Sequence, residues 1–434
     1  MRADTDPLLP ALHSASEELA RSGVRFEVFA RLGEHAHLVL DQDGGLERRE
    51  SHELGVACRV SASGRAGFAA AAGGGARAGR QAALAAFDAM LPSPDPLPPR
   101  EVLGTSGSAL AHPPTEPAQQ EAFAHALASA LQDASSGVTL VQVRLLGGTS
   151  SAALATGEGF LARAAAGGAV VELLLAPPAG PWRHLHFAAP ALADLEPEAL
   201  ARRAIEAALL ATRGGAPDRQ LADVLLAPAV AAPLLVALAQ HLARETKDDG
   251  ALAHTRVSRS WNLVDERPGP AGLLPLPWDG EGLPARRIVL VAGGHLRERL
   301  ATWERAQRTG EQPGGAVRPS YRHPPLPGPA NLVVFSETAL PQPDLLALLE
   351  SGFYLALPAG AVRVDLASGR FALRAAAVAV RHGKPAATHP LVDLRGSFRR
   401  LLGALAATGG DAESFSLASA VTTPSLLFRR LEIA

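Results

Sequence analysis

The sequence predicts an α+β protein, with an N-terminal α/β domain built from an antiparallel sheet and helices, and a C-terminal β-rich mixed domain. Apolar residues recur at helical spacing in a few separated segments. Between those segments, shorter runs alternate apolar and polar residues, as half-buried strands do. A chain of 434 residues is long enough for more than one core. We expect two domains, residues 1–220 and 221–434.

The first hundred residues predict two helices and four strands. Residues 7–22 place Leu8, Leu12, Ala15 and Leu19 on one helix face, and a second helix is expected at 77–91. Asp43-Gly44 and Ser63-Gly64 fit hairpin turns between alternating runs. Those runs predict strands at residues 25–31, 35–41, 46–51 and 54–61.

Residues 92–117 are rich in proline and predict a long surface connection. A helix is expected at 118–134 and another from Asp194 to Leu210, with Pro197 near its start. Glycine-separated runs between these helices predict strands at residues 138–146, 150–155, 160–165 and 169–176. From about residue 253 we expect short strands and loops, a strand at 287–292, and helices at 295–307 and 342–351.

The composition narrows the functional classes. A net charge of −2, with arginine scattered among acidic residues, argues against a dedicated nucleic-acid surface. The doublets Arg286-Arg287, Arg399-Arg400 and Arg429-Arg430 are interpreted as solvated edges. Cys58 is the only cysteine, so no intrachain disulfide or thiolate cluster is expected. No signal peptide or membrane-spanning run is predicted, and a cytoplasmic protein is expected.

Several kinds of catalytic or binding site are unsupported by the sequence. No phosphate-binding loop motif is present, and Gly104-Thr105-Ser106-Gly107 lacks the spacing of a nucleophile elbow. His184 and His186 share one face of a predicted strand, as do His35 and His37, but neither pair has a further ligand at a telling spacing. His52-Glu53 is not followed by the second histidine of a zinc-protease helix.

Residues 226–244 form the longest apolar helical pattern. Leu234, Leu235, Leu238 and Leu242 describe a buried helix, and periodicity alone indicates no more than that. By itself, His241 is more typical of a core or surface histidine than of a metal ligand.

The C-terminal half contains several short motifs. They include Ser260 and Asn262 before a variable loop at 266–277, Asp279 and Gly280 in a D-x-E-G turn, Asn331 after Pro-Gly, and Asp365, Ser368 and Gly369 in V-D-x-x-S-G-x-F. These motifs resemble, in the same order, those of the TldD/PmbA family, also called modulator of DNA gyrase, and in particular its PmbA or TldE branch. The resemblance places these eight family-signature positions at a cleft or an interface. The similarity in the N-terminal half is looser and consists of the hairpin motif at 55–67.

The resemblance implies a degenerate zinc helix. A zinc-protease helix needs two histidines to hold the metal and a glutamate to deprotonate its water. When the family's Gly-Trp-x-Gly-x-Leu-Leu-His-Glu-x-x-x-His frame is laid over residues 229–241, Val236 takes the place of the first histidine and Ala237 that of the glutamate. Only His241 remains, and no cysteine follows Cys58 to serve as a third ligand. We therefore expect no catalytic residue, no metal ligand and no cofactor in this chain, with zinc in a partner subunit.

The function that the resemblance implies is that of a non-catalytic subunit. We expect the chain to pair with a TldD-type zinc metallopeptidase and to bind unfolded or modified peptides, without nucleic acid or membrane. A stand-alone homodimeric peptide-binding or scaffold protein, active in the maturation of a ribosomally made peptide, remains the alternative. Apolar stretches at 224–239, 271–277 and 353–360 suggest an interface, so a dimer with its C-terminal domains in contact is predicted.

Overall fold

The computed structural model describes residues 6–111, 116–134, 137–210, 213–244, 255–268, 277–336, 338–417 and 419–434. Helices and strands are mixed along the chain, which confirms the α+β class. Every strand up to Ala189 belongs to one eight-stranded sheet, and the strands from Gln220 onward form three further sheets. We call these two parts of the chain the N-terminal half and the C-terminal half.

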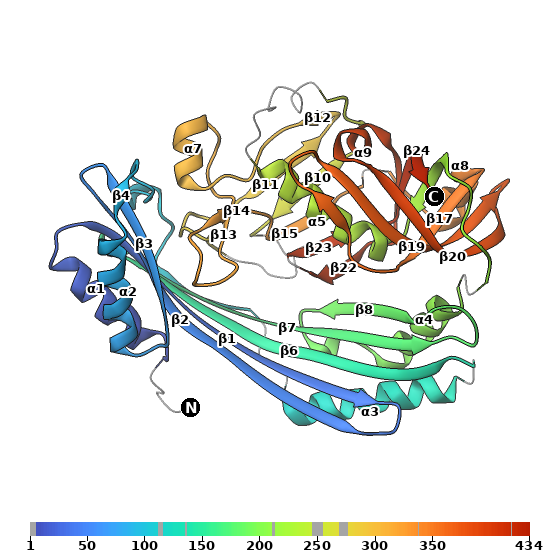
Figure 1. The fold of residues 1–434 in the computed structure, drawn as a ribbon, viewed down its shortest axis with the longest axis horizontal. Helices are drawn as coiled ribbons and strands as arrows, with labels where there is room; N and C mark the ends of the chain where they lie inside the picture. The colour runs from blue at the N-terminus through green and yellow to red at the C-terminus, as the bar shows by residue number, and fades with distance from the viewer. Residues whose placement is uncertain are drawn as a thin grey trace.

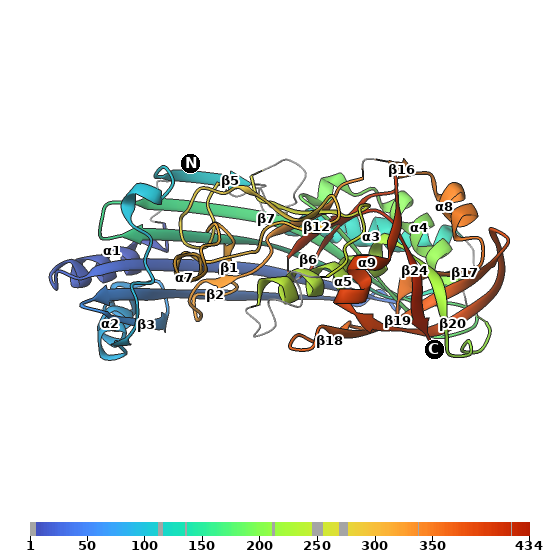
Figure 2. The same cartoon turned by 90° about the horizontal axis from the view of Figure 1, so that it is seen from above.

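Four long strands dominate the N-terminal half and run beneath the C-terminal half (Figures 1 and 2). They are β1 (Arg25–Asp41), β2 (Leu46–Ala62), β6 (Thr139–Thr156) and β7 (Leu161–Ala176). The sheet order is β4-β3-β2-β1-β6-β7-β5, with β8 also paired to β7. The shorter strands are β3 (Arg65–Ala72), β4 (Leu91–Pro92), β5 (Gly107–Ala111) and β8 (Arg183–Ala189). All pairings are antiparallel except that of β5 with β7.

The prediction of eight short strands in this sheet was wrong, because each long strand had been divided in two. Gly147 and Gly148, taken as a turn, are ladder positions of β6 and pair with Ala169 and Gly168. The middle of the sheet lies between its two helix-covered ends, so polar residues such as Glu34 and His52 are exposed there without interrupting the strands. The two hairpin turns were correct: Gly44, Ser63 and Gly64 all have positive φ, as such tight turns require.

The helices of the N-terminal half cover the two ends of the sheet. They are α1 (Leu9–Ala20), α2 (Ala76–Asp88), α3 (Pro117–Asp133) and α4 (Pro197–Leu209), all at the predicted places. On β1, Val28 packs with α1 and α2, and Leu38 packs with α3. Because side chains on a strand alternate between faces, these even-numbered residues place the three helices on one side. The odd-numbered residues, including Glu27 and Arg31, face the C-terminal half.

The C-terminal half packs two larger sheets around helix α5 (Pro228–Ala243). One sheet has the order β12-β11-β10-β15-β23-β22, and the other has the order β16-β21-β24-β20-β19-β17-β9, with β18 on β19 and β24 also paired to β9. The first contains β10 (Asn262–Glu266), β11 (Arg287–Ala292), β12 (His295–Leu296), β15 (Asn331–Val334), β22 (Glu413–Ser416) and β23 (Ala420–Thr423). The second contains β9 (Gln220–Leu226), β16 (Ala339–Leu340), β17 (Gly352–Pro358), β18 (Arg363–Asp365), β19 (Arg370–Arg381), β20 (Lys384–Ser397), β21 (Leu405–Gly409) and β24 (Leu426–Ile433).

Among the described residues, a two-stranded sheet and three short helices complete the C-terminal half. They are β13 (Ala316–Val317) with β14 (Leu326–Pro327), and the helices α7 (Trp303–Thr309), α8 (Gln342–Leu349) and α9 (Phe398–Ala404). Strand β11 and helix α8 match the prediction. The helix expected at 295–307 was wrong in its first part, because residues 295–296 pair with β11 and the helix begins only at Trp303. Helix α9 was not predicted.

The proline-rich segment is more than a surface connection. It contains the 3₁₀ helix Arg100–Val102 and strand β5, and it buries Leu97 and Leu103. Gly104 N donates a hydrogen bond to Gly282 O of the C-terminal half at 2.9 Å. The segment therefore lies against the C-terminal half.

The apolar stretches that suggested an interface are largely internal. Residues 224–239 form the end of β9 and most of α5, whose apolar side chains are nearly all buried in the C-terminal core, and Phe353 and Leu355 of β17 join the same core. The stretch at 271–277 and the loop 266–277 lie mostly outside the described residues. No helix of the described ranges is long and apolar enough to cross a membrane.

Candidate functional site

Helix α5 contains Val236, Ala237 and His241, the three positions that the resemblance predicts to be those of a degenerate zinc helix. It begins at Pro228, where the fixed φ of proline suits a first helical position. Val236 and Ala237 are 6% and 7% exposed and pack in the core between the two sheets. Neither side chain can bind a metal or deprotonate a water molecule.

His241 lies at the end of α5 and is 6% exposed. One ring nitrogen, Nδ1, is 2.9 Å from Leu366 O, and the ring centroid is 5.3 Å from that of Phe398. On the other side, a Cβ added to Gly369 would lie 2.9 Å from the imidazole. The ring is thus fixed by the turn that follows β18.

That turn contains three of the family-signature positions. Asp365 accepts hydrogen bonds from Ala367 N at 2.9 Å and from Ser368 Oγ at 2.6 Å. The bond from Ser368 lowers the pKa of Asp365. Gly369 has φ +67°, a region that favours glycine, and its N–H donates to Asp365 O. The structure therefore brings Ser368 and Gly369 together with Asp365, and the turn meets His241.

Three other signature positions lie in or beside strands β10 and β15, apart from His241. Ser260 Oγ donates to Ala406 O at 3.3 Å. Asn262 begins β10 and accepts from Phe335 N through its carbonyl. Asn331, which is 1% exposed, donates its N–H to Asp265 Oδ1 at 2.6 Å. The contacts of Asn262 and Asn331 hold β10 beside β15, and the contact of Ser260 holds the turn before β10 against β21, so all three have a structural role.

Asp279 and Gly280 lie where the two halves meet. Asp279 accepts three backbone hydrogen bonds, from Glu281, Leu283 and Ala316, at 2.8, 3.1 and 3.2 Å. Gly280 packs so closely on Val317 that an added Cβ would lie 3.0 Å from its backbone. The turn is therefore rigid and directs Glu281 toward the N-terminal half.

Glu281 completes a buried cluster of charges that the sequence did not predict. We call Glu27, Arg59, Glu281 and Arg318 the interdomain charge cluster. Arg59 Nη2 lies 2.6 Å from Glu27 Oε2, and Arg59 Nη1 lies 3.1 Å from Glu281 Oε1. Arg318 pairs with Glu27 and also donates to Gly280 O. The signal in the sequence is a charged residue within each of two otherwise apolar strand runs, but the partner in the other half cannot be identified from spacing.

Burial and charge act in opposite directions on the two glutamates. Burial favours a higher pKa at Glu27, but the charges of Arg318 and Arg59 outweigh it and lower that pKa. At Glu281, burial outweighs the charge of Arg59 and raises the pKa to about 7. Burial also raises the pKa of the adjacent Asp279.

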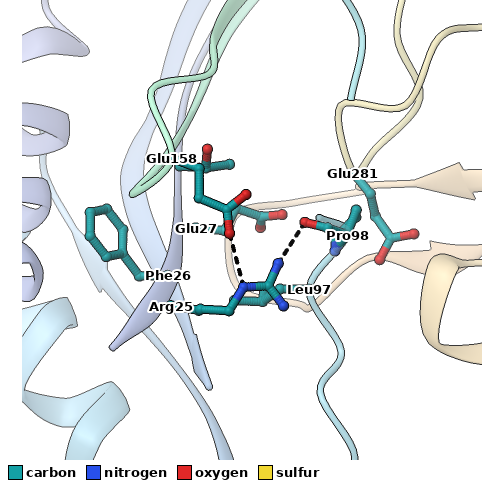
Figure 3. A pocket seen from close by; sticks show the side chains of 8 residues that line it. Arg25, Phe26, Glu27, Leu97, Pro98, Glu158 and Glu281 are labelled. Carbon is teal, nitrogen blue, oxygen red and sulfur yellow. Dashed lines mark hydrogen bonds and ion pairs between the residues drawn. The ribbon is translucent and has the colours of Figure 1, made fainter. Parts of the chain in front are cut away.

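The void beside this cluster is too small for a substrate. Figure 3 shows Glu27 and Glu158 close to Arg25, with Glu281 farther away beyond Pro98; Arg25 donates hydrogen bonds to Glu158 and to Pro98 O. The void has a volume of about 10 Å³, which is room for roughly one water molecule. The cluster therefore joins the two halves and is not a ligand pocket.

The histidine pairs do not gain the ligands of a metal site. His184 and His186 both face Glu172 of β7, at 3.8 and 4.0 Å, which confirms that they share a strand face. Burial lowers the pKa of His186. Among the described residues, no group of three or more His, Cys, Asp or Glu side chains is placed to hold a metal ion. Cys58 is buried beneath α1 and α2, and burial raises its pKa to about 12.

Comparison with known proteins identifies the family to which this chain belongs. Residues 219–434 match the family model of the PmbA/TldA metallopeptidase C-terminal domain. Through this match, the chain belongs to the TldD/PmbA family. Comparison with curated proteins gives no match.

Solved structures extend the similarity of fold to nearly the whole chain. A modulator of DNA gyrase from Thermotoga maritima is 17% identical, with a TM-score of 0.78 over 98% of this chain and 99% of that one. TldE from Thermococcus kodakarensis is 17% identical, with a TM-score of 0.75 over 97% and 100% of the two chains. A modulator of DNA gyrase from Bacteroides thetaiotaomicron is 16% identical, with a TM-score of 0.77 over 99% of each chain.

Proposed function

We propose that this chain is the non-catalytic, TldE-like subunit of a zinc metallopeptidase, and that it pairs with a TldD-type subunit to bind and process unfolded or modified peptides. One observation carries the proposal. At the helix positions where the family frame has a histidine and a glutamate, the side chains are those of Val236 and Ala237, and both are part of the apolar core.

The surroundings of His241 support the same conclusion. Its Nε2 lies against Gly369, where an added Cβ would be 2.9 Å away, and Phe398 covers the ring. A zinc-bound histidine also contacts a backbone carbonyl with one nitrogen, as Nδ1 contacts Leu366 O, but it keeps the other nitrogen directed at an accessible metal position. The proposed division of work is that the partner supplies zinc, its bound water and the general base, while this chain supplies peptide-binding surface. A strand-forming peptide would be held through its main chain.

The test combines activity with metal content. The purified chain should not cleave casein, whereas the chain mixed with a TldD-type partner that carries an intact His-Glu-x-x-x-His helix should give cleavage that a chelator abolishes. Elemental analysis of the dialysed chain should find no stoichiometric zinc. Near-unit zinc that is lost in His241→Ala, or chelator-sensitive cleavage by the chain alone, would contradict the proposal. A stable homodimer that ignores such a partner would favour a stand-alone peptide-binding scaffold instead.

A further inference from the structure

Five arginines gather around an open groove on the C-terminal half, apart from the interdomain charge cluster. Arg256 precedes β10, Arg399 and Arg400 belong to α9, and Arg429 and Arg430 belong to β24. The groove has a volume of about 530 Å³. Helix α9 and strand β24 contact each other (Figure 1), so two doublets that the sequence presents as separate solvated edges share one surface.

The local backbone accounts for this gathering. Ser397 Oγ accepts a hydrogen bond from Arg400 N at 3.3 Å, which begins α9, and Arg400 Nη2 donates to Arg430 O at 2.7 Å. The pairing of β24 with β9 shifts register between Phe428 and Leu431, as at a β-bulge. Arg430 has φ +53° within that shift, an uncommon conformation for a residue with a side chain. The groove is therefore built by specific contacts between two elements.

The groove carries positive charge that the described residues do not neutralise. None of the residues lining it is acidic. Arg429 pairs with Asp223 at 2.5 Å. Within the described ranges, the other four arginines, which are Arg256, Arg399, Arg400 and Arg430, form no ion pair, although arginine–carboxylate pairs are frequent elsewhere in the chain. All four are exposed.

We propose that this groove binds an extended acidic polypeptide segment in trans, with carboxylates of the segment paired to Arg256, Arg399, Arg400 and Arg430. Guanidinium groups match carboxylates in a bidentate geometry, and a cluster of them selects acidic motifs. The volume lies within the usual range of ligand-binding clefts. This inference goes beyond the proposed function, because it holds whether or not the chain pairs with a peptidase.

A nucleic acid is the less suitable occupant. Among the described residues that line the groove, none has an aromatic side chain on which a base could stack. A longer polyanion would also run beyond the groove, over a protein whose net charge is −2 and which therefore offers little further attraction. A short acidic peptide needs only the four arginines that form no ion pair with the described residues.

The test measures binding of a fluorescently labelled hexaglutamate peptide to the full chain by anisotropy. The groove variant is Arg399→Gln with Arg430→Gln. These two arginines are chosen because their side chains form no hydrogen bond with the described residues. The matched control is Arg77→Gln with Arg80→Gln, which removes the same charge from exposed positions on α2. Circular dichroism and the midpoint of urea unfolding verify that both variants are folded.

We expect the groove variant to weaken hexaglutamate binding by about tenfold near 0.1 M salt, since each exposed ion pair contributes modestly. The control should change affinity less than about twofold, and added salt should weaken binding to the wild-type chain. A hexaglutamine peptide should not bind. Equal affinity in the groove and control variants, equal binding of hexaglutamine, or tighter binding of a single-stranded oligonucleotide than of hexaglutamate would overturn the proposal.

Discussion

Replacing Arg59 with methionine should lower the free energy of unfolding at pH 8 by about 3–5 kcal/mol. Arg59, Glu27 and Glu281 have side chains that are 7%, 3% and 1% exposed, so water cannot replace the lost guanidinium. Glu27 keeps Arg318 after the substitution. Glu281 keeps the N–H of Trp303 but loses the only ion-pair partner that the described residues give it.

The size of the loss should depend on pH. With Arg59 in place the pKa of Glu281 is about 7, so this carboxyl is mostly ionised at pH 8 and mostly protonated at pH 6 in the wild-type chain. Because the charge of Arg59 lowers this pKa, the pKa is higher still in the variant. A protonated Glu281 tolerates burial without a cation. The loss caused by Arg59→Met should therefore be smaller at pH 6 than at pH 8.

Urea unfolding followed by circular dichroism at both pH values measures these losses. The matched control is Arg144→Met, since Arg144 pairs with Glu172 at 3.3 Å but has a 45% exposed side chain. An exposed pair of this kind contributes at most about 1 kcal/mol. A loss for Arg59→Met no larger than that of the control, or a loss that does not change with pH, would refute the argument that burial makes this cluster important.

Three further predictions concern pH, a glycine and assembly. The folded-state pKa of Glu281 lies above its ordinary value of 4.5, so its contribution to stability is complete below about pH 4.5 and is lost as the pH rises to about 7. Across that pH range, the free energy of unfolding of the wild-type chain, measured with urea at each pH, should therefore fall by about 3 kcal/mol relative to that of Glu281→Gln. If the free energies of unfolding of the two chains change in parallel with pH, the argument is wrong. Gly369→Ala should destabilise the chain more than Gly310→Ala, because both glycines have positive φ but only Gly369 faces the ring of His241; equal urea midpoints would contradict this contact. We expect a dimer whose interface buries about 2,000 Å² or more. Light scattering over a dilution series measures the mass, and a monomer at micromolar concentration, with and without a partner, would contradict the dimer.

The local part of the fold was predictable because it depends on neighbours in sequence. The four N-terminal helices, the turn at Asp43-Gly44 and strand β11 all follow from periodicity or turn chemistry. The long strands were divided because glycines and exposed polar residues look like turns when the neighbouring strands are unknown. Gly148 sits in β6 because β1 and β7 pair with it on both sides.

The candidate site shows a similar limit. The burial of residues 234–242 was predictable from their apolar pattern, whereas the assignment of His241 to a zinc-helix position rests on the family resemblance and stays a prediction. The contact of His241 with Gly369 was not predictable, since the two residues are distant in sequence and meet only when α5 packs near β19. Glu27, Arg59 and Glu281 were missed for the same reason, and so was the convergence of the arginine doublets.

The pairing of β24 with β9 also constrains how the C-terminal half folds. Strand β9 is the first strand of that half, yet its residue Gln220 pairs with Ile433 of β24, the last strand of the same half. Such a long-range contact closes a large loop before it gains any packing, which makes folding slow. During synthesis, β9 and the apolar helix α5 leave the ribosome long before their last partner strand, and they remain exposed until it arrives. Helix α5, whose apolar side chains are nearly all buried in the finished fold, is thus a segment that needs protection while the chain is being made.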